Sequence, residues 1–177
     1  MSATFNRSIQ AKRLLDGMSA ENFLPMRMEI KTIGRQKVKR LVPAVSNLIF
    51  VKGTEVEIQK IKDGIDYLQF ICLKEGGRRK RIIVPDKQME DFIRLTSESP
   101  EDTWIFTPEE NNLAKGDKVR IHGGPFDGVE GTFVKVSGKR RKMVVVTIPT
   151  ILSAATLSFV PEMLEKIKEE NVTTQTY

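Results

Sequence analysis

The residue types that most often do chemistry are sparse in this chain, which has one histidine, His122, and one cysteine, Cys72. A lone histidine lacks a second nitrogen or thiolate ligand to share a metal, and His122 precedes two glycines, so we expect an ordinary turn residue. Cys72 falls at an inward position of an expected strand, which favours a buried, inert thiol. The chain contains no GxxxxGK[ST], GxGxxG, GxSxG or HExxH motif. We therefore predict no catalytic residue, no metal, no cofactor and no enzymatic activity.

Two runs of basic residues are the other candidates for chemistry. The first comprises Arg35, Lys37, Lys39 and Arg40, and the second comprises Arg78, Arg79, Lys80 and Arg81. Clustered lysines and arginines can bind phosphates, so a polyanionic partner is expected. For either run alone, a solvated hairpin is an equally good interpretation. Few aromatic residues interleave the runs, and stacking of bases is not predicted.

The net charge of +6 over 177 residues is unevenly distributed. Residues 1–97 carry 19 basic and 11 acidic residues, residues 98–112 carry five acids and no base, and residues 113–177 carry 10 bases and seven acids. The acidic stretch also contains prolines and asparagines, a composition typical of a linker. We therefore predict a first domain over 1–97, a linker over 98–112 and a second domain over 113–177. Within the linker, the apolar residues 104–106 are expected to pack on a domain.

The composition also limits the cellular setting. A single cysteine excludes an intramolecular disulfide scaffold. No apolar run approaches the roughly 20 residues that span a bilayer, and the first residues lack the apolar core of an export signal. We expect a cytoplasmic protein with no membrane partner, and a monomer.

In the first domain, segments with helical and strand patterns alternate. Ala11, Leu14, Leu15 and Met18 form one apolar stripe, and Thr54 with Glu57 fits a capping box. Residues 31–40 have no clear period and are expected to be a basic loop. The helices are expected over 6–16, 54–64 and from 85 onward, and the strands over 47–51, 67–72 and 81–84.

The second domain has the pattern of a small barrel. Short strands are expected over 118–122, 129–137 and 142–148, with turns between them. Phe126 and Phe133 are candidates to fill the barrel interior. A short final helix is expected over 162–170. The fold class is therefore predicted to be α+β, an α/β sandwich with an antiparallel sheet followed by a small SH3-like β-barrel.

Residues 116–148 resemble a KOW motif, with alternating Val119 and Ile121, a Gly-Gly-Pro-Phe turn over 123–126, and Gly131 inside the next strand. Three further segments, Phe23-Leu24-Pro25-Met26, residues 42–51 and Val84-Pro85-Asp86-Lys87-Gln88, resemble in order and spacing the NGN domain of NusG-like transcription factors. The resemblance covers nearly the whole chain. Its length and acidic linker are similar to the Bacteroides-type paralogues that act on capsular polysaccharide operons.

Two departures from the family pattern concern the first domain. NusG-like domains begin with an aromatic strand, and this chain begins Met-Ser-Ala-Thr-Phe, so the first strand is expected to be missing or truncated. The family's Phe-Pro-Gly-Tyr segment is here Val45-Ser46-Asn47-Leu48. Without its aromatic residues, binding through that segment should be weaker or differently shaped.

The resemblance implies a transcription elongation and antitermination factor that binds the β′ clamp helices of RNA polymerase and contacts upstream or non-template DNA or nascent RNA. The matching polymerase-binding positions are Val45, Leu48, Phe50, Met89 and Phe92. The second domain of the family binds a small-subunit ribosomal protein or Rho, and the matching contact loop includes Ile148, Pro149, Ile151 and Leu152. The alternative is a ribosomal or RNA-binding structural protein that uses the same barrel.

Overall fold

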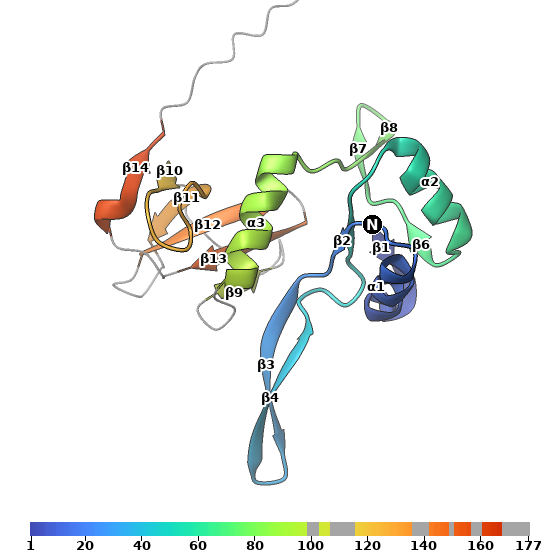
Figure 1. Ribbon diagram of the computed structural model, residues 1–177, viewed down its shortest axis with the longest axis horizontal. Helices are drawn as coiled ribbons and strands as arrows, with labels where there is room; N and C mark the ends of the chain where they lie inside the picture. The colour runs from blue at the N-terminus through green and yellow to red at the C-terminus, as the bar shows by residue number, and fades with distance from the viewer. Residues whose placement is uncertain (99–102, 107–115, 136–141, 149–150, 157–160, 168–177) are drawn as a thin grey trace, which may run out of the picture. The chain divides into compact units, whose positions relative to one another are not determined.

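The computed structural model divides the chain into two compact units, Met1–Pro85 and Asp86–Tyr177 (Figure 1). It describes residues 1–98, 103–106, 116–135, 142–148, 151–156 and 161–167. Helices are combined with strands that pair antiparallel in every ladder of the described residues, which confirms the α+β prediction.

The first unit is built around two short strand pairs and two helices. Its core contains Ala3, Ala11, Leu15, Ile49, Ile65, Tyr67 and Leu68. A first strand is present, although only two residues long, and the Ser2 position also bridges to Leu48. The elements are β1 (Ser2–Ala3) paired with β6 (Leu68–Gln69), β2 (Asn22–Phe23) paired with β5 (Phe50–Val51), the 3-10 turn Thr4–Asn6, α1 (Ser8–Gly17) and α2 (Glu55–Gly64).

The two helices of this unit confirm the sequence pattern to different degrees. In α2 the capping box is present, with the Glu57 amide donating to Thr54 Oγ1 at 3.3 Å and the Thr54 amide donating to Glu57 Oε2 at 2.8 Å. These bonds to Thr54 lower the pKa of Glu57. In α1 only half of the predicted apolar stripe is buried, because Leu14 and Met18 are exposed.

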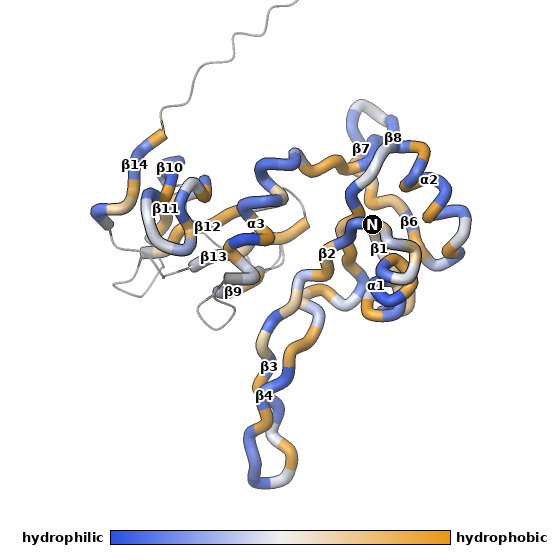
Figure 2. The backbone as a smooth tube through the Cα atoms, in the orientation of Figure 1, coloured by the Kyte–Doolittle hydropathy of each residue, from blue (hydrophilic) through white to orange (hydrophobic). Residues whose placement is uncertain are grey.

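Two hairpins complete the first unit. β3 (Met26–Ile33) pairs with β4 (Gln36–Pro43), and β7 (Cys72–Glu75) pairs with β8 (Arg78–Arg81). The prediction of a basic loop over 31–40 is therefore wrong, because this segment belongs to the β3–β4 hairpin. The single strand expected over 67–72 is also wrong. It is split between β6 and β7, and Cys72 is exposed. Figure 2 shows polar and apolar residues interspersed along β3 and β4.

The described strands of the second unit form one antiparallel sheet in the order β14-β10-β11-β12-β13-β9. β12 has the predicted bounds, and Phe126 is fully buried. The final helix expected over 162–170 is wrong, because a 3-10 turn over Pro161–Met163 leads into a strand that pairs with β10. The strands are β9 (Thr103–Phe106), β10 (Asp117–Ile121), β11 (Glu130–Lys135), β12 (Lys142–Ile148), β13 (Leu152–Thr156) and β14 (Leu164–Lys166).

Helix α3 (Asp86–Glu98) belongs to the second unit and contacts β12 and β13. Phe92 and Leu95 on this helix are fully buried. Its polar face binds backbone carbonyls of the same unit: Gln88 Nε2 donates to Thr147 O at 2.7 Å, and Arg94 Nε donates to Pro125 O at 2.9 Å. The units therefore divide at residues 85/86, whereas the sequence predicted a first domain through residue 97.

Candidate nucleic-acid interface

The β3–β4 hairpin distributes the first predicted basic run over two faces. In its ladder Lys39 lies opposite Ile30 and Lys37 opposite Thr32, whereas Arg40 lies opposite Glu29. Because successive residues of a strand point to opposite faces, Lys37 and Lys39 share one face and Arg40 lies on the other. Arg35 lies in the turn beside Gly34, whose φ of 61° suits glycine.

These four cations are free to bind a ligand. Residues 27 to 41 are all exposed, and among the described residues none of the four has a carboxylate or hydrogen-bond partner. Two more basic residues, Arg27 and Lys31, share the face of Arg40. The sequence run did not include them, because their relation to Arg40 depends on the strand pairing.

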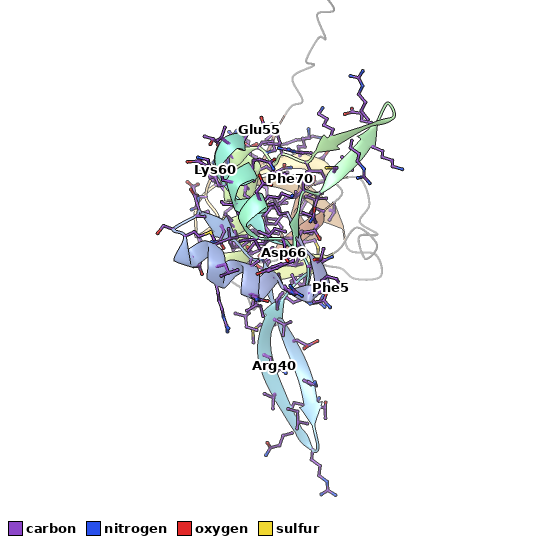
Figure 3. All side chains as sticks on the ribbon, turned by 90° about the vertical axis from the view of Figure 1, so that its right-hand side faces the viewer. Phe5, Arg40, Glu55, Lys60, Asp66 and Phe70 are labelled. Atoms are coloured by element: carbon purple, nitrogen blue, oxygen red, sulfur yellow. The ribbon has the colours of Figure 1, made fainter. Side chains whose placement is uncertain are left out.

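In the β7–β8 hairpin, the second predicted run is partly committed to the first unit itself. Arg81 donates to Glu55 Oε1 at 3.1 Å and to Gln59 Oε1 at 3.0 Å, and its guanidinium lies 3.9 Å from the centroid of the Phe70 ring. Figure 3 shows Phe70 and Glu55 in this part of the unit. Lys80 lies 3.3 Å from Glu75. Arg81 therefore anchors the hairpin, and Lys80 is already partnered.

Two of the remaining cations of this hairpin, Lys74 and Arg79, face each other. Arg79 lies directly opposite Lys74 in the ladder, and within the described part of the chain neither they nor Arg78 have an ion-pair partner. Like charges directly opposite on a strand pair repel each other, and a bound anion removes that repulsion. Lys74 was not recognised from the sequence, because it precedes the Arg78–Arg81 run and meets it only through the hairpin.

An exposed aromatic residue lies elsewhere on the first unit. Phe5 is 83% exposed and has a φ of 58°, a left-handed conformation that costs a non-glycine residue about 1–2 kcal/mol. The Arg7 guanidinium lies 5.3 Å from the centroid of the Phe5 ring and 4.9 Å from that of Tyr67. Asn6, which also has positive φ, accepts a hydrogen bond from Ser46 at 2.8 Å. Nothing in the sequence pattern indicated this arrangement.

The predicted polymerase-binding residues do not form one exposed patch. Leu48 is 3% exposed, Phe50 is 9% exposed and Phe92 is fully buried, so these three are core residues. Val45 and Met89 are half-buried. The set is also divided, because the residues of the 45–50 segment belong to the first unit and those of α3 to the second.

The predicted partner loop of the second unit is likewise mostly core. Ile148 and Leu152 pair at the end of the β12–β13 ladder and are buried, whereas Ile151 is half-buried. Pro149 lies outside the described residues. The burial of two of the expected contact residues leaves Ile151 as the accessible apolar side chain among those that the structure describes.

His122, expected as an ordinary turn residue, is tied to the last strand. Its Nε2 lies 2.7 Å from Glu165 Oε2, and its amide donates to Met163 O at 2.7 Å. Nearby, Arg120 binds Glu130 at 2.6 Å, an ion pair that raises the pKa of Arg120. Within the described residues, no group of three or more histidine, cysteine or acidic side chains is close enough to hold a metal.

The structural boundary sharpens the distribution of charge. Residues 1–85 contain 17 basic and eight acidic residues, for a net charge of +9, and residues 86–177 contain 12 basic and 15 acidic residues, for a net charge of −3. The whole positive excess of the chain therefore resides on the first unit, which also carries both basic hairpins. Of the described helices, none is long and apolar enough to cross a membrane.

The sequence of this two-unit chain is similar to that of a known protein. It is 23% identical over 134 residues to the transcription termination/antitermination protein NusG of Borreliella burgdorferi, a match that covers 76% of this chain and 60% of the relative. Over this match the chain is similar to NusG. A solved structure, "Domain interaction in Thermotoga maritima NusG", has 21% identity to this chain and a TM-score of 0.41, covering 95% of this chain and 93% of that one. No protein-family model matches.

Proposed function

We propose that the chain is a transcription elongation and antitermination factor that binds the β′ clamp helices of RNA polymerase and suppresses pausing or termination, acting in the cytoplasm without catalysis. The observation that carries this proposal is the similarity to a curated NusG over 134 residues. The net charge of +9 on the first unit supports a position beside DNA or nascent RNA. The chain spans about 60% of the length of that relative.

The test is single-round transcription with purified RNA polymerase on a template that carries a pause site and a terminator. The proposal predicts shorter pauses or greater read-through when the full chain is added. Unchanged pausing and termination at saturating protein contradict it. Co-sedimentation with small ribosomal subunits in the absence of any effect on transcription supports the alternative of a structural RNA-binding protein.

Polymerase docking can be tested at the accessible position of the predicted set. Val45→Asp places a charge at a half-buried side chain in the loop before β5, and it should weaken retention on immobilised clamp helices. Val56→Asp controls for the added negative charge, because Val56 is 63% exposed on α2, and thermal unfolding of both variants shows whether the first unit stays folded. Equal retention of both variants argues against docking through the 45–50 segment. Phe92→Asp is unsuitable, because it would disrupt the core of the second unit.

The finer proposals concern partners and operon specificity. The second unit binds a small-subunit ribosomal protein or Rho, with Ile151 as the contact to test by Ile151→Asp. The factor acts preferentially on operons for surface polysaccharide synthesis. Preferential read-through on templates that carry the leader of its own operon supports this specificity, and equal activity on unrelated leaders contradicts it.

A further inference from the structure

The β3–β4 hairpin is an isolated ribbon. Its two strands form a sheet of their own and pair over eight positions, from Met26 with Pro43 to Ile33 with Gln36. At about 3.3 Å per residue, eight residues extend roughly 26 Å. Figure 3 shows the ribbon, with Arg40 labelled, extending away from the helices of the first unit. A two-stranded ribbon with no covered face buries little apolar surface and so contributes little to the free energy of folding of its unit. A ribbon of this length is better explained by a binding role.

Positive charge is present on both faces and at the tip of this ribbon. One face carries Lys37 and Lys39, and the turn carries Arg35. The other face carries three cations and one acid, namely Arg27, Lys31, Arg40 and Glu29. Over residues 26–43, six basic residues and one acidic residue give a net charge of +5.

Apolar side chains are interspersed with these charges. Toward the tip, Ile30 is 60% exposed and Ile33 is 58% exposed, and Val38 is also exposed. Ile30 shares a face with Lys37 and Lys39, whereas Ile33 and Val38 share the face of Arg40. Each face therefore combines cations for phosphates with apolar groups suited to base edges and thymine methyl groups.

This distribution distinguishes among nucleic-acid ligands. A single strand, or the outer surface of a duplex, lies along one face of a ribbon and uses only the cations of that face. A ribbon inside a groove has a phosphate backbone on each side and uses both faces. The major groove of B-form DNA, about 12 Å wide, admits a two-stranded ribbon, whereas the deep and narrow major groove of A-form RNA excludes side chains.

We propose that the β3–β4 ribbon inserts into the major groove of duplex DNA, with its two basic faces directed to the phosphates of the two strands. The inference rests on the proposed nucleic-acid contact of the first unit and specifies the ligand as B-form duplex. Arg35, in the turn at the tip, enters first and lies nearest the base edges, whereas the exposed isoleucines on the two faces line the walls of the groove.

The test is fluorescence anisotropy of the full chain with a 25-base-pair DNA duplex, a duplex RNA and a single DNA strand of the same sequence, each over a salt series. Two double variants separate the faces: Lys37→Gln with Lys39→Gln, and Lys31→Gln with Arg40→Gln. Arg13→Gln with Lys60→Gln is the matched control, since both are exposed basic residues of the same unit outside the ribbon and, among the described residues, neither has an ion-pair partner.

Groove insertion predicts that duplex DNA binds tighter than the other two ligands. Each ribbon double variant should weaken duplex binding roughly 10- to 50-fold at 0.1 M salt and reduce the salt slope by about 2, because each phosphate contact contributes about 0.9 to the slope. The control should change neither. Ile33→Ser should weaken binding without changing the slope.

Several results overturn the inference. If only one of the two ribbon double variants weakens duplex binding, the DNA contacts a single face of the ribbon. Equal affinity for duplex RNA or for the single DNA strand excludes insertion into the major groove. A change in the salt slope of the control variant shows non-specific electrostatic attraction. The transcription assay separates this failure from that of the proposed function. Ribbon variants that bind duplex DNA like the parent while the parent alters pausing refute only the ribbon proposal.

Discussion

Replacing Phe92 tests whether α3 is part of the core of the second unit. Phe92 is fully buried in a helix that contacts β12 and β13. Truncating a buried phenylalanine to alanine costs about 3–5 kcal/mol, a large part of the 5–15 kcal/mol that stabilises a typical domain. Phe92→Leu is the more useful variant, because a hydrophobic replacement of smaller volume change costs about 1 kcal/mol and leaves the unit folded.

The single tryptophan of the chain makes the assay specific for one unit. Trp104 lies in β9, which pairs with β13, so its fluorescence reports unfolding of the second unit. With a urea dependence of about 1 kcal/mol per molar for a domain of this size, Phe92→Leu should lower the Trp104 midpoint by about 1 M. Phe92→Ala should lower it several-fold more or abolish the transition.

A matched variant in the other unit provides the control. Leu15 is a fully buried residue of α1 in the first unit, and Leu15→Ala should leave the Trp104 midpoint unchanged. If Phe92→Leu also leaves the midpoint unchanged, α3 does not belong to the cooperatively folding unit that the Trp104 fluorescence reports. The domain boundary would then lie after α3, near residue 98.

Three further predictions follow from the described contacts. Thr54→Ala removes the side-chain half of the capping box and should lower the free energy of unfolding of the first unit by about 1 kcal/mol, measured by urea denaturation. The Glu57 pKa should rise only part of the way toward its ordinary value, because the amide of residue 54 still donates to Glu57 and is the larger cause of the lowered pKa. An unchanged free energy of unfolding would contradict the role of the Thr54 side chain. Gly131→Ala should lower the Trp104 urea midpoint, because its Cβ would lie 2.8 Å from both Val144 Cγ1 and Val145 O. Gly124→Ala is the control, since its Cβ would meet no atom within 4 Å and the substitution should cost only backbone strain. Burial lowers the pKa of the Met1 amine from 8.0 to about 6, so the unfolded chain binds more protons between these values and stability should rise by about 2–3 kcal/mol from pH 6 to pH 8, a slope that amino-terminal acetylation should remove.

Local signals in the sequence predicted several elements correctly. The capping box at Thr54 and the strand over 142–148 depend on short-range patterns, and the structure has both. Phe126 is fully buried, as predicted for an interior residue of the second domain. Such features depend on near neighbours in the chain, which the sequence displays directly.

The errors arise where the pattern depends on a partner. The β3–β4 ribbon has no buried face, so no alternation of polar and apolar residues marks its strands over 31–40. Cys72 is exposed because the predicted strand is interrupted between β6 and β7. The interruption changes the face on which Cys72 lies. An amphipathic helix such as α3 has an inner face, but its sequence does not indicate which domain that face contacts.

The same limit applies to the candidate interface. The basic runs were evident from composition, but the pairing that sets Lys74 opposite Arg79, and that places Lys37 and Arg40 on different faces, depends on hairpin register. The commitment of Arg81 to Glu55 and Phe70 joins residues distant in sequence. Charge was therefore predictable, whereas its orientation was not.

The position of the boundary at residues 85/86 changes the tether between the units. β8 ends at Arg81 and α3 begins at Asp86, so residues 82–85 are the connection, with a maximum reach of about 14 Å. The linker expected over 98–112 would have reached about 50 Å. A short tether holds the second unit at a millimolar or higher effective concentration around any site that the first unit occupies. Capture of one partner by the first unit therefore favours binding of the second unit to sites within that reach.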